Sequence, residues 1–147
     1  MRRIIAIEPD QEMVRRLQVN IERDDNLYSD ILSGRIEIVE KTIGSQNYDR
    51  CIALDQLNLD HSLRGFIKIE VDGSELEALR SGKQLLSHVN ADVLVHTHSS
   101  ELEMNCAVFL EDIGYKCRII ETAWWRSLVP DRQRWRHNRW LFATPQS

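Results

Sequence analysis

The sequence has few of the residues that hold small secreted or metal-bound domains together. Its three cysteines, Cys51, Cys106 and Cys117, are odd in number, lie far apart and form no Cys-x-x-Cys pair. A disulfide framework and a cysteine zinc site are therefore both disfavoured, and the cysteines are expected in the core. A chain of 147 residues can bury a real core without such crosslinks, so we expect one domain in a reducing compartment.

Long apolar runs are missing as well. The opening residues, MRRIIAIEPD, place only four apolar residues before Glu8, which is too short for a signal peptide. No later apolar run approaches the length of a membrane span, and neither internal repeats nor low-complexity tracts are present. We expect a cytoplasmic protein with no membrane partner.

Charge is unevenly spread along the chain. The net charge of −4 argues against nucleic acid as the default partner, but residues 124–140 carry +4 and the rest −8. The arginines and tryptophans between Arg126 and Arg139 could bind phosphates or stacked bases. The alternative, which we favour, is a solvated hairpin whose tryptophans cover the end of a sheet.

Periodicity predicts strands and helices in alternation. A helix capped by Asp10 follows the first strand, a second starts at Ser74, and a third ends near Gly114. Residues 47–63 are mostly polar and predict a loop with a short turn of structure. Strands are predicted over Arg3–Glu8, Ile36–Ile43, Gly65–Val71, Asp92–Thr97, Lys116–Ala123 and Arg139–Thr144.

This alternation predicts an α/β fold, a three-layer sandwich in which helices cover both faces of a parallel sheet. Ligands of such sheets bind beyond the carboxyl ends of the strands. That rule selects as candidate site residues Glu8, Thr42, Glu70, Asp72, His96 and His98.

Several blocks of the sequence, in order, resemble the FkbM family of S-adenosylmethionine-dependent methyltransferases. The run FIKIEVDGSELEALRSGKQLL is similar to the family signature, a strand followed by a glutamate and a leucine-rich helix. IAIEPDQEMVRRLQVNI, VEKTIG and ALDQL fit upstream blocks, and DVLVHTH, LEDIGYKC and NRWLFATP fit downstream ones. The resemblance covers nearly the whole chain and implies a Rossmann-like class I methyltransferase fold.

The resemblance also implies roles for the candidate residues. Glu8 matches the acid that binds the cofactor's ribose hydroxyls, and a carboxylate can accept from both. Thr42 would lie by the adenine. Glu70 and Asp72 would face the region of methyl transfer, where catalytic residues belong.

The sequence departs from the family in three places. The acids Glu70 and Asp72 stand in the reverse of the usual Asp-then-Glu order, and His96 stands where the family commonly has Glu. The family's first strand and its glycine-rich cofactor loop are absent, so we expect residues 1–147 to form one methyltransferase-like domain, N-terminally truncated relative to the family, that binds S-adenosylmethionine weakly. Loss of a central strand leaves open strand edges, from which we expect a homo-oligomer, most simply a homodimer.

Two histidines complete the candidate catalytic set. His96 and His98 stand two apart at the end of a strand, so both side chains should point to one face. One of them could act as a general base; a metal site is disfavoured because no third ligand is identifiable.

Three functions remain open. The first is methyl transfer to an oxygen of a small molecule or sugar. The second is a degenerate, non-catalytic methyltransferase-like fold that acts as an interaction module or survives as a gene remnant. The third is binding of anionic ligands or nucleic acid through Arg126–Arg139.

Overall fold

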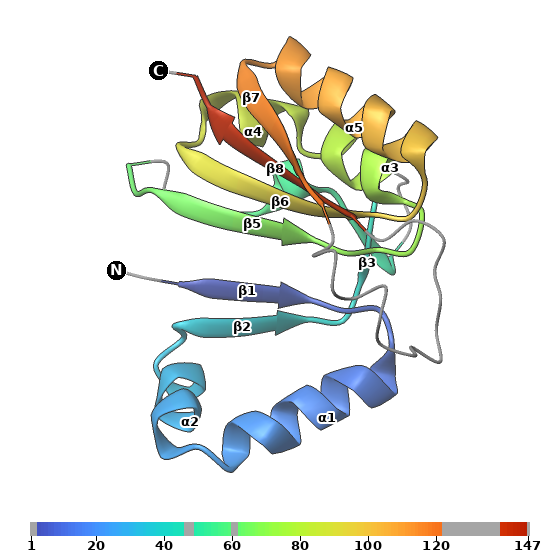
Figure 1. The fold of residues 1–147 in the computed structure, drawn as a ribbon. Coiled ribbons are helices and arrows are strands. Elements are labelled where there is room, and N and C mark those ends of the chain that lie inside the picture. Colours follow the sequence, from blue (N-terminus) through green and yellow to red (C-terminus); the bar gives the residue numbers. More distant parts are fainter. Residues whose placement is uncertain (1–2, 46–48, 60–61, 122–138, 147) are drawn as a thin grey trace. The chain divides into compact units, whose positions relative to one another are not determined.

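A computed structural model of the protein describes residues 3–45, 49–59, 62–121 and 139–146 (Figure 1). The chain falls into two compact units, Met1–Ile52 and Ala53–Ser147. Each unit is a mixture of strands and helices, as the alternating pattern predicts.

The first unit is built on a pair of parallel strands, β1 (Ile4–Ile7) and β2 (Ile36–Val39). Two helices connect them, α1 (Gln11–Glu22) and α2 (Asp25–Leu32). The Asp10 carboxylate accepts hydrogen bonds from the amides of Glu12 and Met13, which confirms Asp10 as the cap of α1. Asp24 caps α2 in the same way, and the periodicity did not predict this second helix.

A second parallel pair completes this unit and corrects the expected strand over Ile36–Ile43. The amide of Lys41 donates to the carbonyl of Val39, and this tight turn ends β2. Strand β3 (Thr42–Ile43) then pairs with β4 (Cys51–Ile52). β4 lies inside the segment that the sequence predicted to be loop. The strand was missed because two residues are too few to show a periodic pattern.

The second unit contains a sheet in the order β5-β6-β8-β7 among the described residues (Figure 1). β5 and β6 are parallel, whereas β8 runs antiparallel to both β6 and β7. The last strand therefore departs from the all-parallel sheet that the sequence predicted. The elements are β5 (Gly65–Ile69), α3 (Glu75–Arg80), α4 (Lys83–His88), β6 (Ala91–Thr97), α5 (Ser100–Asp112), β7 (Tyr115–Ile120) and β8 (Arg139–Pro145).

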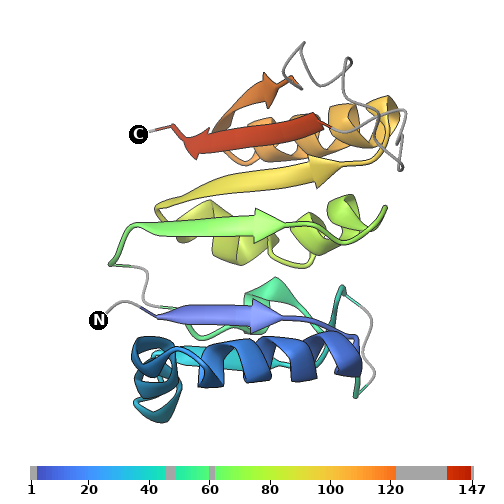
Figure 2. The ribbon, with the colours of Figure 1, turned by 60° about the horizontal axis from the view of Figure 1, so that its bottom comes forward.

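The core of the second unit lies between the sheet and its helices. α3 and α5 pack on one face of the sheet (Figure 2), and every second residue of β6, from Ala91 to Thr97, is buried. Asp92, Leu94 and His96 alternate with them and are half-buried on the opposite face.

The helix expected from Ser74 is divided in two at Ser81 and Gly82, where a 3₁₀ turn, η1 (Leu54–Gln56), packs against it. The Ser81 hydroxyl accepts from the amide of Leu54. The Asp55 carboxylate accepts from the amides of Gln84 and Leu85 in the first turn of α4. The ALDQL block of the sequence therefore has two structural roles: Leu54 packs where α3 and α4 are divided, and Asp55 caps α4.

Candidate functional site

The loop that follows β5 is a sharp turn made of two residues with positive φ. Asp72 has φ +45° and Gly73 has φ +99°. The first value is uncommon for a residue other than glycine, although aspartate tolerates it better than most. The turn carries the chain from Glu70, just past β5, to Glu75, the first residue of α3. The Gly73 amide donates to the Glu75 carboxylate across 3.1 Å.

His98, just past the end of β6, is held between two carboxylates. Its Nδ1 lies 2.7 Å from Oε1 of Glu75, and its Nε2 lies 3.4 Å from Oδ1 of Asp72. The Glu75 side chain is fully buried, with 0% exposure, whereas that of Asp72 is 96% exposed. One ring nitrogen therefore faces the protein interior and the other faces the rim of the turn.

His96 lies beside His98 on the same part of the sheet. The two ring centroids are 4.6 Å apart in an edge-to-face arrangement, as two-residue spacing along a strand predicts. The other neighbours of the His96 ring are Trp140 of β8, stacked at 4.5 Å, and Glu70, whose Oε1 lies 3.2 Å from Nδ1. His96 thus contacts an aromatic ring, a second imidazole and a carboxylate.

Lys68 sets the charge at this end of β5. Its Nζ lies 2.5 Å from Oε2 of Glu70 and 5.3 Å from the centroid of the Trp140 ring. The Lys68 hydrogen bond lowers the pKa of Glu70, although partial burial opposes the shift; the Lys68 charge and the two nearby histidines lower it further. Glu70 is therefore ionised at neutral pH.

The structure brings the four predicted catalytic residues, Glu70, Asp72, His96 and His98, into one cluster within the second unit. Sequence reasoning missed Lys68, Glu75 and Trp140, which complete it. The signal for Lys68 was available, because it shares a face of β5 with Glu70. For Glu75 the signal was the glutamate of the family signature, which opens the helix after the strand, but nothing in the sequence showed that it is buried against His98.

A metal site is not apparent in this cluster. Across the described residues, no group of three or more His, Cys, Asp or Glu side chains is arranged to hold a metal ion.

The two predicted cofactor residues lie in the first unit. Glu8 directly follows β1; its amide donates to the carbonyl of Val39, and its Oε1 accepts from the amide of Asp10 across 2.9 Å. Glu8 thus helps to orient the start of α1. Thr42 is exposed at the start of β3, where its amide donates to the carbonyl of Arg50.

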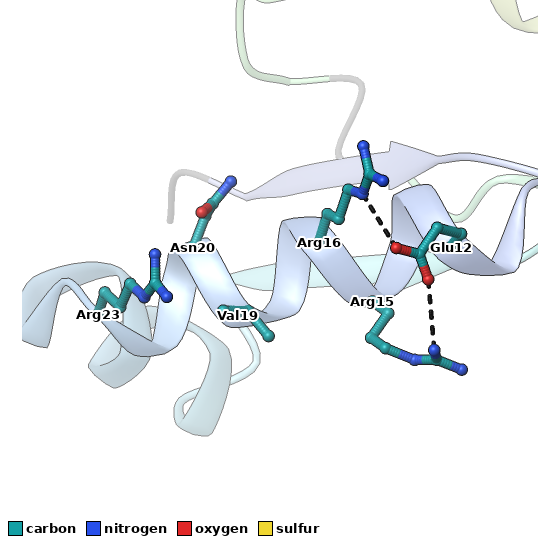
Figure 3. Close-up of a pocket in the computed structure, with 6 residues that line it drawn as sticks. All are labelled: Glu12, Arg15, Arg16, Val19, Asn20 and Arg23. Atoms are coloured by element: carbon teal, nitrogen blue, oxygen red, sulfur yellow. Dashed lines mark hydrogen bonds and ion pairs between the residues drawn. The ribbon is translucent and has the colours of Figure 1, made fainter.

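A shallow groove on α1 is a poorer candidate (Figure 3). Its lining comes entirely from this helix and the residue that follows it, and it does not lie at the carboxyl end of a strand. Glu12 pairs with Arg15 at 3.3 Å and with Arg16 at 3.0 Å, so two of the three arginines of the groove already share a carboxylate. The lining residues are Glu12, Arg15, Arg16, Val19, Asn20 and Arg23.

The arginine-rich stretch predicted as an anion-binding alternative lies outside the described residues, except for Arg139 at its end. The guanidinium of Arg139 donates to the carboxylate of Glu103, which is nearly buried on α5, and lies 3.8 Å from Glu121. Arg139 is therefore engaged within the second unit. No helix in the described ranges combines the length and apolar character that a membrane crossing requires.

Comparison with known proteins shows which family and which fold the chain resembles. Residues 1–117 match the family model described as the methyltransferase FkbM domain. The crystal structure of methyltransferase FkbM from Methylobacillus flagellatus KT is similar over 95% of this chain and 36% of its own, with a TM-score of 0.71 and 22% identity. An inferred methyltransferase from Thermoplasma acidophilum is similar over 99% of this chain and 58% of its own, with a TM-score of 0.53 and 10% identity.

The chain thus spans between about a third and three fifths of the length of the two structures it resembles. No curated protein sequence matches it. The structural similarities support a Rossmann-like methyltransferase fold, and the family match extends over most of the chain. The chain therefore belongs to the FkbM methyltransferase domain family.

Proposed function

We propose that this chain takes part in methyl transfer from S-adenosylmethionine to an oxygen atom of a small molecule or sugar. The observation that carries the proposal is the cluster of Glu70, Asp72, His96 and His98 at the carboxyl ends of β5 and β6. This edge is where ligands of open α/β sheets bind. The cluster offers both a base and acceptors for hydroxyl groups.

The residues of the first unit support a cofactor role. Glu8 and Thr42 follow β1 and β2 in sequence, at the positions that the family resemblance assigns to the ribose and the adenine. The Glu8 carboxylate accepts one backbone hydrogen bond through Oε1, which leaves accepting capacity for ribose hydroxyls. Its chemistry therefore fits the cofactor.

S-adenosylmethionine, when bound, supplies an electrophilic methyl group on a sulfonium. The chain's own contribution would be to position the acceptor and to remove its proton. His98 would take that proton as a new bond forms between the acceptor oxygen and the methyl carbon and the carbon–sulfur bond breaks. Glu70, kept ionised by Lys68, would accept a hydrogen bond from another hydroxyl of the acceptor.

The test is a titration of isotope-labelled protein with S-adenosylmethionine, followed by amide NMR because it detects weak binding. We expect shifts at residues 8–10 and 70–73.

Two variants make the titration specific. Glu8→Ala should weaken binding by about tenfold or more, since a hydrogen bond to a charged group is worth about 1.5–3 kcal/mol. Glu101→Ala removes an exposed acid from the first turn of α5 and should leave binding unchanged. A chain that shows no shifts at millimolar cofactor would overturn the proposal and favour the non-catalytic interaction module instead.

A further inference from the structure

The proposed function leaves one buried acid of the cluster without a role. Glu75 is fully buried at the first position of α3, and its Oε1 accepts from the Gly73 amide and lies 2.7 Å from His98. Its second oxygen, Oε2, is buried with no hydrogen-bond partner among the described residues. Burying a carboxylate that is not fully hydrogen-bonded costs free energy of folding. A residue with a purely structural role at this position would cost less if its side chain were uncharged.

The geometry fixes where the proton of the His98 ring resides. The amide of Gly73 can only donate, so Oε1 of Glu75 acts as an acceptor toward it. The Nδ1 atom of His98 must then donate to the same oxygen, which places the ring proton on Nδ1 in the neutral imidazole. Nε2 faces the exposed Asp72 carboxylate, 3.4 Å away, and is the nitrogen to which a further proton would be added.

His96 lacks this arrangement. Its ring is stacked on Trp140, and the carboxylate near its Nδ1 is that of Glu70, which is partly exposed and paired with Lys68. A carboxylate shared with a lysine orients an imidazole less strictly than a buried one does. Of the two histidines, His98 is therefore the one prepared to accept a proton.

We propose that Glu75 is a positioning residue that holds His98 with its proton on Nδ1 and its Nε2 directed at the hydroxyl of the methyl acceptor. This inference rests on the proposed function, in which His98 is the base. It adds the residue that makes His98 competent, and it selects His98 over His96. The same logic of a base oriented by a buried carboxylate operates in hydrolytic triads.

The first test measures the tautomer of His98 directly. Two-bond proton–nitrogen NMR spectra of labelled protein distinguish a ring proton on Nδ1 from one on Nε2, with His98→Gln and His96→Gln to assign the signals. We expect the Nδ1–H form in the unmodified protein and a mixture of both forms in Glu75→Gln. Glu77→Gln, on the same short helix, is the matched control and should leave the Nδ1–H form unchanged.

The second test measures the reactivity of Nε2 with diethyl pyrocarbonate, which acylates the unprotonated ring nitrogen. Mass spectrometry follows His98, with exposed His88 as the internal standard. Glu75→Gln should slow the modification of His98 severalfold, because part of the ring population would then carry its proton on Nε2. The rate at His88 should stay constant.

Several outcomes would overturn the inference. An Nε2–H tautomer in the unmodified protein would do so without any variant, so the test survives even if Glu75→Gln fails to fold. The inference would also be overturned if a folded Glu75→Gln protein kept the same His98 tautomer and the same rate of His98 modification. Neither measurement uses S-adenosylmethionine, so failure of the cofactor titration and failure of this inference can be told apart.

Discussion

At the scale of single residues, charge in this protein is set by close neighbours. Lys68 donates to Glu70 and lowers the pKa of that carboxyl below its ordinary value of 4.5. Because the folded pKa is lowered, the ionised pair stabilises the fold above the unfolded pKa, and this contribution is lost as pH falls through the folded value. Both groups are largely exposed, so the gain in stability is small.

We predict that Lys68→Met raises the pKa of Glu70 toward 4.5, because the variant removes both the hydrogen bond and the positive charge. A carboxyl carbon NMR titration of Glu70 measures the midpoint. Lys83→Met removes an equal charge from α4 and should leave the midpoint in place. An unchanged midpoint in Lys68→Met would show that the pair does not form in solution.

Burial sets the chemistry of two cysteines. Cys106 has no exposed surface, and desolvation raises the pKa of its thiol to about 12; the same cause raises the pKa of Cys117 to about 11. The thiolate is the reactive form, so both residues should be inert at ordinary pH.

We predict slow alkylation of Cys106 and Cys117 by iodoacetamide in the folded protein at about pH 8.5, the ordinary thiol pKa. Peptide mass spectrometry gives the rate at each site. In urea both should react at the rate of a free thiol. Rapid labelling of Cys106 in folded protein would contradict its buried position on α5.

At the scale of elements, the contact between η1 and the α3–α4 break is the most sensitive to substitution. A Cβ atom added at Gly82 would lie 2.7 Å from the Cβ of Leu54, which is nearer than real Cβ atoms approach. Leu54 cannot swing aside, since its amide donates to Ser81 and the next amide, of Asp55, donates to the Ser81 carbonyl.

We predict that Gly82→Ala destabilises the protein by about 1–3 kcal/mol, the usual cost of overpacking. Urea denaturation should show a lower midpoint with an unchanged slope. Gln84→Ala, an exposed substitution in the same helix, should stay within about 0.5 kcal/mol. Equal stability of Gly82→Ala and the unmodified protein would mean that η1 does not pack here.

The Asp55 cap offers an independent test of the same junction. Its carboxylate accepts from the amides of Gln84 and Leu85, groups that would otherwise lack partners at the start of α4. We predict that Asp55→Ala costs about 1 kcal/mol of unfolding free energy. Asp112→Ala, in the exposed last turn of α5, should have little effect, and a similar loss in both variants would argue against the cap.

The same junction shows what the sequence could and could not predict. Long periodic segments were recognised, such as the strand over residues 92–97 and the helix carrying Cys106, because many residues repeat one pattern. The division at Gly82 and the short strands β3 and β4 depend on contacts between distant segments, which no local pattern records.

The residues of the candidate site also differ in whether the sequence could predict them. Glu70, Asp72, His96 and His98 could be chosen because strand ends in an α/β sheet converge. The family signature includes Glu75, but its role could not be predicted, because that role comes from full burial and from a bond to a residue 23 positions away. The antiparallel direction of β8 was likewise hidden, since strand direction is set by tertiary pairing.

At the scale of the whole molecule, every described strand except β6 and β8 is paired on one side only within its own unit, and β1 and β5 are two of these edge strands. Among the described residues β1 pairs only with β2, and β5 pairs only with β6. Apolar side chains stand on both edge strands: Ile4 is 58% exposed and Phe66 is 60% exposed. Open edges with apolar neighbours favour pairing with another chain, and oligomers of one chain are most often two-fold dimers.

We therefore predict that the protein forms a homodimer at high micromolar concentration, measured by sedimentation velocity. Phe66→Lys should weaken the dimer by about ten- to a hundredfold, because burial of a phenylalanine side chain is worth about 1.5–3 kcal/mol and a lysine on an edge strand opposes pairing. Met104→Lys is the matched control, since Met104 is 67% exposed but lies on α5, which packs against β6, β7 and β8 rather than against the edge strand β5. A monomer at that concentration, or equal weakening by the two variants, would show that the open edge of β5 does not mediate self-association.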